Sequence, residues 1–136
     1  MRHAFQGLPG IAGRPRPIVD LVVGGLDLAP QACLLDSGAS EIRMGGHVAE
    51  IAGIDLAGAG AVESEIVIGG LRTAGRGVRT QLELRQGTGR HVWTPTVYFC
   101  EPWPWAFGLL GLAGLDPSRV LLDTYEEWVE LQPARR

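Results

Sequence analysis

A carboxylate stands directly after an apolar run in the segment ACLLDSGASEIRM, residues 32–44. Asp36 follows two leucines, and Ser37 and Gly38 come next. A carboxylate at the end of a hydrophobic strand is unfavourable unless hydrogen bonds or chemistry compensate for its lost hydration. Two interpretations fit these residues. Asp and Ser hydrogen-bond neighbouring backbone groups in turns, where glycine accepts a positive φ; alternatively, Asp36 is a catalytic carboxylate.

The chemistry open to such an aspartate is peptide-bond hydrolysis without a metal ion or a covalent intermediate. This reaction needs a water molecule deprotonated on one side and a carbonyl oxygen protonated on the other. Two carboxylates that share one proton do both, because like charges so close together do not both ionise. Asp36 would supply one of them. Ser37 would hydrogen-bond the outer carboxylate oxygen, or the loop that carries the second carboxylate. Gly38 would bring its backbone N–H close to the two carboxylates.

The segment LLDSGAS (34–40) resembles the active-site motif of clan AA aspartic proteases, in which two apolar residues precede Asp-Ser/Thr-Gly-Ala-Ser/Asp. Roughly seventy residues later this family has a second motif, apolar-apolar-Gly, and GLLG (108–111) occupies that place. The single motif in a short chain is similar to the retropepsins, the retroviral-type proteases, and to their bacterial single-domain relatives. The resemblance covers about residues 17–132.

This resemblance implies an aspartic endopeptidase that acts on peptide or protein substrates and needs neither a cofactor nor a metal ion. Its catalytic turn would be Asp36, Ser37 and Gly38. GLLG would pack beneath that turn, with Gly111 allowing the close approach. The implied substrate-binding residues are Ala39, Gly69, Gly70, Leu71, Trp103, Trp105 and Leu109.

The glycine pair Gly69-Gly70 resembles the tip of the flap that closes over substrate in this family. Adjacent glycines give a tip whose φ and ψ change as it opens, and a plain hairpin turn explains the same two residues equally well. Trp103 and Trp105 precede the second motif, where the family lines its substrate pockets. Aromatic residues spaced by proline serve equally well as lids on a core.

A second hypothesis comes from a different class: a catalytically weak or inactive module that binds peptides or dimerises on the same fold. The family places Arg, Asp or Asn after the second motif, whereas Leu112 and Ala113 follow it here. A β-barrel ligand carrier is a third hypothesis, but it leaves the Asp-Ser-Gly turn unexplained. The order of both motifs and the hairpin favours a catalytic Asp36 over a structural turn. Asp36 itself argues against the inactive module, because a degenerate copy would be expected to lose that aspartate.

The two-aspartate mechanism predicts a homodimer, because the chain has a single Asp-Ser/Thr-Gly sequence. Asp123-Thr124 is followed by Tyr125 rather than glycine, and the remaining length is needed to complete one lobe. A two-fold axis beside Asp36 would supply the second carboxylate, and two-fold symmetry is the commonest in oligomers. The terminal segment EWVELQ (127–132) is the expected interface strand.

The elements that must position these residues are predicted to be short strands, because 20 glycines and 9 prolines interrupt the chain. Residues 1–16 read as a loose N-terminal arm, followed by one domain over 17–136. The expected fold is all-β and mainly antiparallel, an acid-protease closed β-barrel with one short helix over 46–56. The expected strands span residues 17–25, 31–40, 41–44, 63–70, 77–86, 91–100, 119–125 and 127–132.

Composition excludes several other classes. The chain has 136 residues, 46% hydrophobic and 20% charged, as in a folded globular domain. A net charge of −3 argues against a nucleic-acid partner, and no segment is apolar enough over sufficient length to indicate a membrane partner. No export signal is recognisable, so a cytoplasmic location and reduced Cys33 and Cys100 are expected. The cysteines and the three histidines have no metal-ligand spacing.

The arginines at positions 72–90 are expected to be solvated hairpin residues, with an anionic-ligand patch as the alternative.

Overall fold

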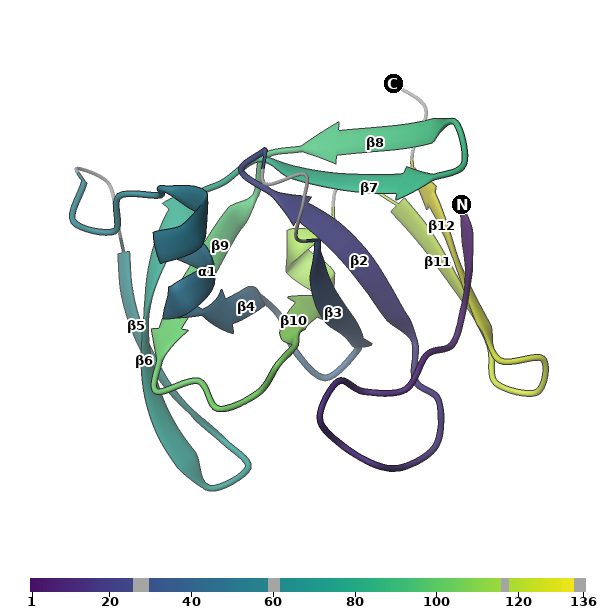
Figure 1. Ribbon diagram of the computed structural model, residues 1–136, viewed down its shortest axis with the longest axis horizontal. Helices are drawn as coiled ribbons and strands as arrows, with labels where there is room; N and C mark the ends of the chain where they lie inside the picture. Colours follow the sequence, from purple (N-terminus) through teal and green to yellow (C-terminus); the bar gives the residue numbers. More distant parts are fainter. Residues whose placement is uncertain (26–29, 59–61, 116–117, 134–136) are drawn as a thin grey trace.

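Short strands dominate the computed structural model, which describes residues 1–25, 30–58, 62–115 and 118–133 (Figure 1). The strands are β1 (Arg2–Ala4), β2 (Ile18–Val23), β3 (Gln31–Asp36), β4 (Ile42–Gly45), β5 (Val62–Ile68), β6 (Leu71–Arg79), β7 (Leu82–Gln86), β8 (Gly89–Trp93), β9 (Thr96–Glu101), β10 (Gly108–Gly111), β11 (Ser118–Asp123) and β12 (Trp128–Pro133). The helices are α1 (Gly46–Ala52) and the single 3₁₀ turn η1 (Leu112–Gly114). The prediction of a mostly β, mainly antiparallel protein with one short α-helix is confirmed.

Nine strands form one sheet in the order β5-β6-β9-β4-β10-β3-β2-β7-β8. Two of its pairings are parallel, β3 with β10 and β4 with β9, and the others are antiparallel. The end strands β5 and β8 do not pair with each other in the described chain, and they lie apart in Figure 1. The sheet is therefore open, and the closed barrel expected from the sequence is not observed among the described residues. Strand composition predicts strands but not whether the first and last of them meet.

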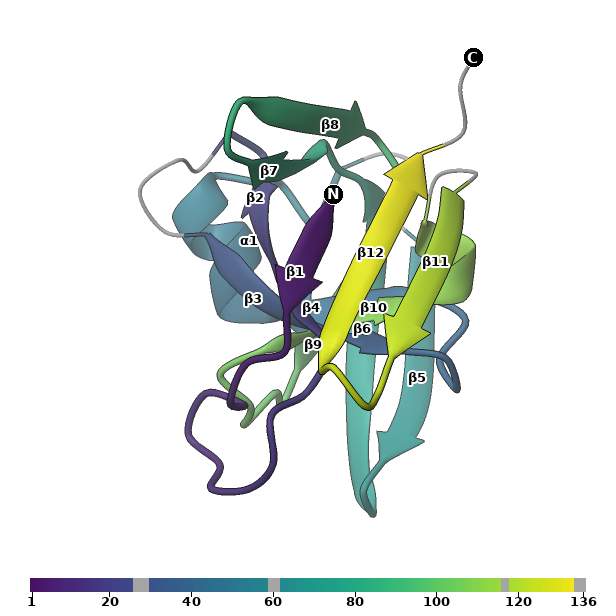
Figure 2. The ribbon, with the colours of Figure 1, turned by 90° about the vertical axis from the view of Figure 1, so that its right-hand side faces the viewer.

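A smaller sheet of three strands, in the order β1-β12-β11, lies beside the large sheet (Figure 2). Val129 and Leu131 of β12 are buried in the same hydrophobic cluster as Leu21, Ile42 and Leu110 of the large sheet. Burial of side chains of this size supplies about 1.5–3 kcal/mol each. The small sheet is thus attached to the main core through the inner face of its central strand.

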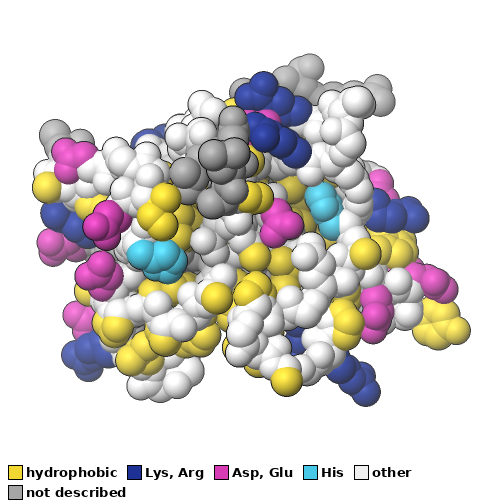
Figure 3. Space-filling model, in the orientation of Figure 1, with side chains coloured by type: hydrophobic (Ala, Val, Ile, Leu, Met, Phe, Trp, Pro, Cys, Tyr) yellow, Lys and Arg dark blue, Asp and Glu magenta, His cyan; other side chains and the backbone are white. Residues whose placement is uncertain are grey.

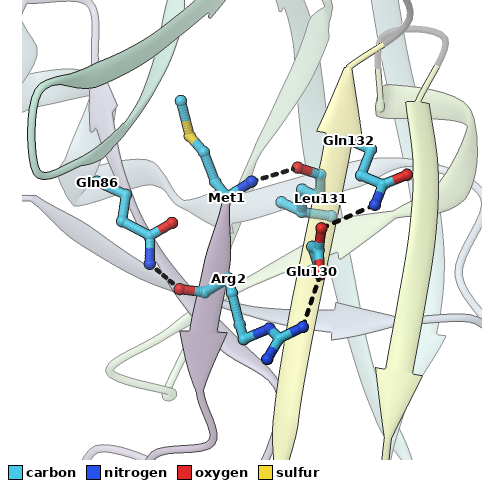
Figure 4. Close-up of polar contacts among 6 residues, drawn as sticks. All are labelled: Met1, Arg2, Gln86, Glu130, Leu131 and Gln132. Carbon is cyan, nitrogen blue, oxygen red and sulfur yellow. Dashed lines mark hydrogen bonds and ion pairs between the residues drawn. The ribbon is translucent and has the colours of Figure 1, made fainter.

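The N-terminal residues are not a loose arm, because β1 pairs with β12 along Arg2–Ala4. Figure 4 shows the polar contacts at this junction. The N-terminal ammonium of Met1 donates to the carbonyl of Leu131 at 2.9 Å, and Arg2 forms an ion pair with Glu130 at 3.2 Å. The Gln86 side chain of β7 donates to the Arg2 carbonyl. The sequence prediction failed here because so short a strand, without β-branched residues, has no periodic pattern of its own.

Several predicted boundaries shift for identifiable reasons. Helix α1 ends before residue 53 instead of reaching 56, because Gly53 has φ 70° and its N–H closes the helix on Glu50. The predicted strand 91–100 divides into β8 and β9 at Pro95, which has no N–H for a sheet. The predicted strand 77–86 divides between β6 and β7. No helix among the described residues has the length and apolar character needed to cross a membrane.

The arginines of the two long hairpins lie at the surface, as predicted. Arg72 pairs with Glu65 across β5 and β6 at 3.1 Å. Arg85 and Arg90 both contact Glu83, whose side chain is only 4% exposed. The hydrogen bond from Arg85 is the main reason that the pKa of Glu83 is lowered, and Arg90 adds to this effect. All cationic side chains of the protein are arginines, and those visible in Figure 3 are scattered around the rim of this face.

The partial burial of His3, where β1 pairs with β12, predicts that the stability of the fold depends on pH. The pKa of His3 is lowered from 6.5, mainly by burial and also by the N-terminal ammonium, against an opposing effect of Asp20. The folded state therefore favours the neutral ring, and the unfolded chain takes up the proton first as the pH falls below 6.5. We expect the free energy of unfolding to decrease below that pH, and His3→Leu to weaken this decrease. Urea denaturation at several pH values measures both, with the exposed His47→Gln as the control. An equal decrease in the His3→Leu variant would contradict the assignment.

Candidate active site

Asp36 is the last residue of β3, and the alternation of this strand decides where its side chain points. Cys33 and Leu35 are buried in the core, so Leu34 and Asp36 face the opposite side of the sheet. After the strand, the N–H of Gly38 donates to Oδ1 of Asp36 at 2.9 Å. The N–H of Ala39 donates to the Asp36 carbonyl at 3.1 Å. The carboxylate is therefore held by the turn that follows it.

Gly38 does not have a positive φ, so one reason given for it from the sequence is wrong. A Cβ at this position would lie 3.3 Å from Oδ1 of Asp36, which is tighter than most such contacts. The glycine thus allows its N–H to come close to the carboxylate. Ser37 is exposed, and its hydroxyl makes no hydrogen bond to the described residues.

Strand β10, the GLLG segment, lies between β3 and β4. It pairs in parallel with β3, where Leu109 is opposite Leu34 and Gly111 is opposite Asp36. It pairs antiparallel with β4, where Leu109 is opposite Arg43. The two motifs recognised in the sequence are therefore neighbours in one sheet, and Leu109, Arg43 and Asp36 share its non-core face.

Gly111 is required at the point where β10 meets the Asp36 turn. Its N–H donates to the carbonyl of Glu41 at 3.1 Å, and the next N–H, of Leu112, donates to the carbonyl of Ala39 at 3.0 Å. A Cβ at position 111 would lie 2.8 Å from the Ala39 carbonyl oxygen and closer still to backbone atoms of Glu41. Only glycine permits this approach, as the sequence predicted.

A cavity of about 510 Å³ lies between the Asp36 turn and strand β5. Four residues predicted from the sequence line it: Asp36, Gly38, Ala39 and Leu109. Its other walls come from Glu41 and Arg43, from Ser64, and from the apolar end of β5 at Ile66–Ile68. The structure thus joins a carboxylate, an ion pair and a hydrophobic strand around one space.

The other predicted site residues do not line this cavity. Gly69 and Gly70 form the exposed tip of the β5–β6 hairpin with φ values of 55° and 80°, the conformation of a type I′ turn, and Leu71 begins β6 behind them. Trp103 donates from Nε1 to the Phe107 carbonyl at 3.0 Å. Its ring meets that of Trp105 edge to face, with 4.9 Å between centroids. The two tryptophans lie in the connection between β9 and β10, where Trp103 also approaches Gly45 at the end of β4.

Arg43 is not among the site residues predicted from the sequence, although its side chain is only 7% exposed and lines the cavity. Its Nη2 contacts Oε2 of Glu41 and donates to Oγ of Ser64 at 3.0 Å. Its Nη1 donates to the sulfur of Cys100 at 3.7 Å, and its guanidinium lies 4.9 Å from the Tyr98 ring centroid. Alternation could have indicated it, since Ile42 and Met44 on either side are core residues. Its contacts with β5 and β9 required the tertiary structure.

Both cysteines are free and buried. Burial raises the pKa of Cys33 to about 12. Burial also raises the pKa of Cys100, although the neighbouring Arg43 opposes that effect. Both sulfurs are therefore neutral thiols near pH 7, unsuited to nucleophilic catalysis. The described residues contain no group of three or more His, Cys, Asp or Glu side chains placed to hold a metal ion.

No protein-family model and no curated protein sequence matches the chain. The geometry of the site is therefore the basis for the function proposed below.

The contact of β10 with the Asp36 turn predicts a large effect of a single methyl group. We expect Gly111→Ala to lower the free energy of unfolding by about 3 kcal/mol, because the added carbon meets backbone atoms that cannot rotate away. The control is Gly7→Ala, at a position with no atom within 4 Å of an added Cβ, which should stay within about 0.5 kcal/mol of the parent. Chemical denaturation measures both, and equal stabilities would refute the tight contact.

Proposed function

We propose that the protein is an aspartic endopeptidase of the retropepsin type. The observation that carries the proposal is the placement of β10 between β3 and β4, which sets Gly111 opposite Asp36. An Asp-containing turn with a purely structural role requires no second motif from a distant part of the chain beneath it. In this proposal the open nine-stranded sheet and the three-stranded sheet together make up a retropepsin-like form of the acid-protease fold.

The chemistry proposed for Asp36 uses one carboxylate from each of two chains. The charged carboxylate accepts a proton from water as the water oxygen bonds to the carbonyl carbon of the scissile peptide, and the neutral carboxyl donates its proton to the carbonyl oxygen, which gives a tetrahedral diol. The carboxyl that took the water proton then protonates the amide nitrogen while the other carboxylate accepts a proton from the diol. The C–N bond breaks, an acid and an amine are released, and the pair again shares one proton. The N–H of Gly38 donates to Oδ1 of Asp36, which holds the carboxylate in position. Oδ2 accepts no hydrogen bond from the described residues and is available to water.

Strand β5 supports the binding of an extended peptide over Asp36. It is an end strand of the large sheet, and its outer edge pairs with no other strand of the described residues, so a further strand could add there. Ile66, Val67 and Ile68 line the cavity, and Val67 is 64% exposed. We propose that the β5–β6 hairpin acts as the flap. A peptide between it and the Asp36 turn would cover apolar surface that is now in contact with water.

The proposed homodimer would use the small sheet. Strand β12, the interface expected from the sequence, has both edges occupied by β1 and β11. Among the described residues the small sheet has two end strands, β1 and β11. The Arg2 carbonyl of β1 already accepts from the Gln86 side chain, whereas β11 pairs on one edge only and lies on the outer side of the small sheet in Figure 2. Leu121 and Leu122 on this strand are 39% and 48% exposed, and Tyr125 in the following turn is 90% exposed. We therefore propose β11 as the interface strand.

The second candidate is a binding module without catalysis, and the bond from Gly38 to Asp36 is equally compatible with it, since an Asp with a structural role makes the same contact. Asp55 provides a matched comparison: its Oδ1 accepts the N–H of Ala57 at 2.9 Å in an exposed turn that does not line the cavity.

The first test is hydrolysis of a diverse peptide library by the parent, Asp36→Asn and Asp55→Asn. We expect Asp36→Asn to reduce turnover at least about a thousandfold, because it removes the general acid and base while keeping the shape. Asp55→Asn should retain turnover, because Asp55 neither lines the cavity nor lies on the proposed interface strand. The parent rate should be highest at acid pH, where the pair of aspartates holds one proton. A rate that rises continuously to pH 9, or equal activity of the Asp36→Asn variant, would exclude the mechanism.

The second test is subunit exchange between active and inactive chains. In a homodimer with a shared pair of aspartates, mixing the parent with an excess of Asp36→Asn chains should lower activity as the square of the parent fraction. Each mixed dimer then has only one Asp36 carboxylate at the shared site, the other position being Asn. Sedimentation of the active species gives the second readout. Activity proportional to the amount of parent chain after exchange, or an active monomer, would contradict the dimer without excluding a binding function.

A further inference from the structure

A charged cluster lies on the cavity wall beside Asp36, on the same face of the sheet. Arg43 of β4 is opposite Leu109 of β10, which is opposite Leu34 of β3, and Asp36 is two residues further along β3. With strands about 4.8 Å apart and about 3.3 Å per residue, Arg43 and Asp36 are separated by roughly 12 Å at their Cα atoms. An extended peptide of a few residues spans this distance.

The hydrogen bonds inside the cluster leave specific groups available. Nη2 of Arg43 is shared between Oε2 of Glu41 and Oγ of Ser64. The second oxygen of Glu41, Oε1, accepts no hydrogen bond from the described residues, and this side chain is 35% exposed. The hydroxyl of Ser64 accepts from Arg43, and its own proton has no acceptor among the described residues. The cavity wall therefore offers one acceptor and one donor.

We propose that Glu41, Arg43 and Ser64 form a subsite that selects a carboxamide side chain, Asn or Gln, of the bound peptide. The amide NH₂ group would donate to Oε1 of Glu41, and the amide oxygen would accept from the Ser64 hydroxyl. Arg43 holds both partners in place and is a positioning residue in this scheme. The inference rests on the proposed function, because it takes the cavity as the place where a peptide lies.

Charge and desolvation favour an amide over the other side chains. A Lys or Arg would come next to the buried guanidinium of Arg43, whose charge already balances Glu41. An Asp or Glu would meet the carboxylates of Glu41 and Asp36. A Leu or Met would cover polar groups without satisfying them, and a site built for hydrogen bonds discriminates strongly against such analogues. A neutral side chain that both donates and accepts avoids all three penalties.

The test measures binding separately from hydrolysis. Positional-scanning octapeptides are titrated against the Asp36→Asn variant by fluorescence anisotropy, so that no peptide is cleaved. We expect one peptide position at which Gln or Asn binds about tenfold more tightly than the similarly sized Leu and Met, and more tightly than Lys and Glu. On the same background, Glu41→Leu combined with Arg43→Leu should reverse this preference toward Leu and leave the other positions unchanged. The milder Ser64→Ala should reduce it.

The matched control is Glu63→Leu combined with Arg76→Leu, which removes an ion pair of the β5–β6 hairpin that does not line the cavity. It should retain the amide preference. The subsite is refuted if no position prefers an amide, if a charged side chain is preferred, if no peptide binds, or if the preference survives in the folded Glu41/Arg43 variant. Amide-selective binding by a protein whose parent form cleaves no peptide would refute the proposed hydrolysis and keep the subsite.

Discussion

The close packing of Gly111 against the Asp36 turn is the contact on which the arrangement of the site depends. It allows β10 to enter between β3 and β4 with hydrogen bonds on both edges, so that residues 31–36, 42–45 and 108–111 become neighbours. The same contact fixes the position of the turn relative to the sheet, since the N–H groups of Gly111 and Leu112 donate to the carbonyls of Glu41 and Ala39. A larger residue at position 111 would separate the strand from the turn.

The face of the large sheet opposite the core carries charged and apolar side chains together. Asp36 and Arg43 lie there because each alternates with core residues, and Leu109 separates them. Burying a guanidinium is costly unless its partners are in place, and Arg43 has three, on three different parts of the chain. The arginine therefore links the Asp36 turn to β5 and to β9. This linkage gives the cavity a polar wall, whereas the apolar end of β5 supplies the facing wall.

The small sheet is built from segments far apart in the sequence, because β1 near one end of the chain pairs with β12 near the other. Strand β1 reaches β12 through backbone pairing, and Gln86 ties it to the β7–β8 hairpin. With β12 in the centre, the exposed hydrophobic residues of the small sheet gather on β11 and its following turn. An unpaired edge with exposed leucines is a surface that proteins usually cover, which is why the proposed second chain is assigned to this side of the molecule.

The sequence by itself determined the strand-rich composition, the helix start at residue 46 and the hairpin at Gly69-Gly70, because these features depend on local patterns. The contact of GLLG with the Asp36 turn followed only from the family resemblance of the two motifs. Only the tertiary structure decided that the described sheet is open, that residues 2–4 form a strand, and that Arg43 and Ser64 border the cavity while Trp103 and Trp105 do not. The physical reason is that each of these depends on contacts between distant segments. Alternation shows which face a side chain occupies, but the strands that meet it there are set by the pairing of the whole sheet.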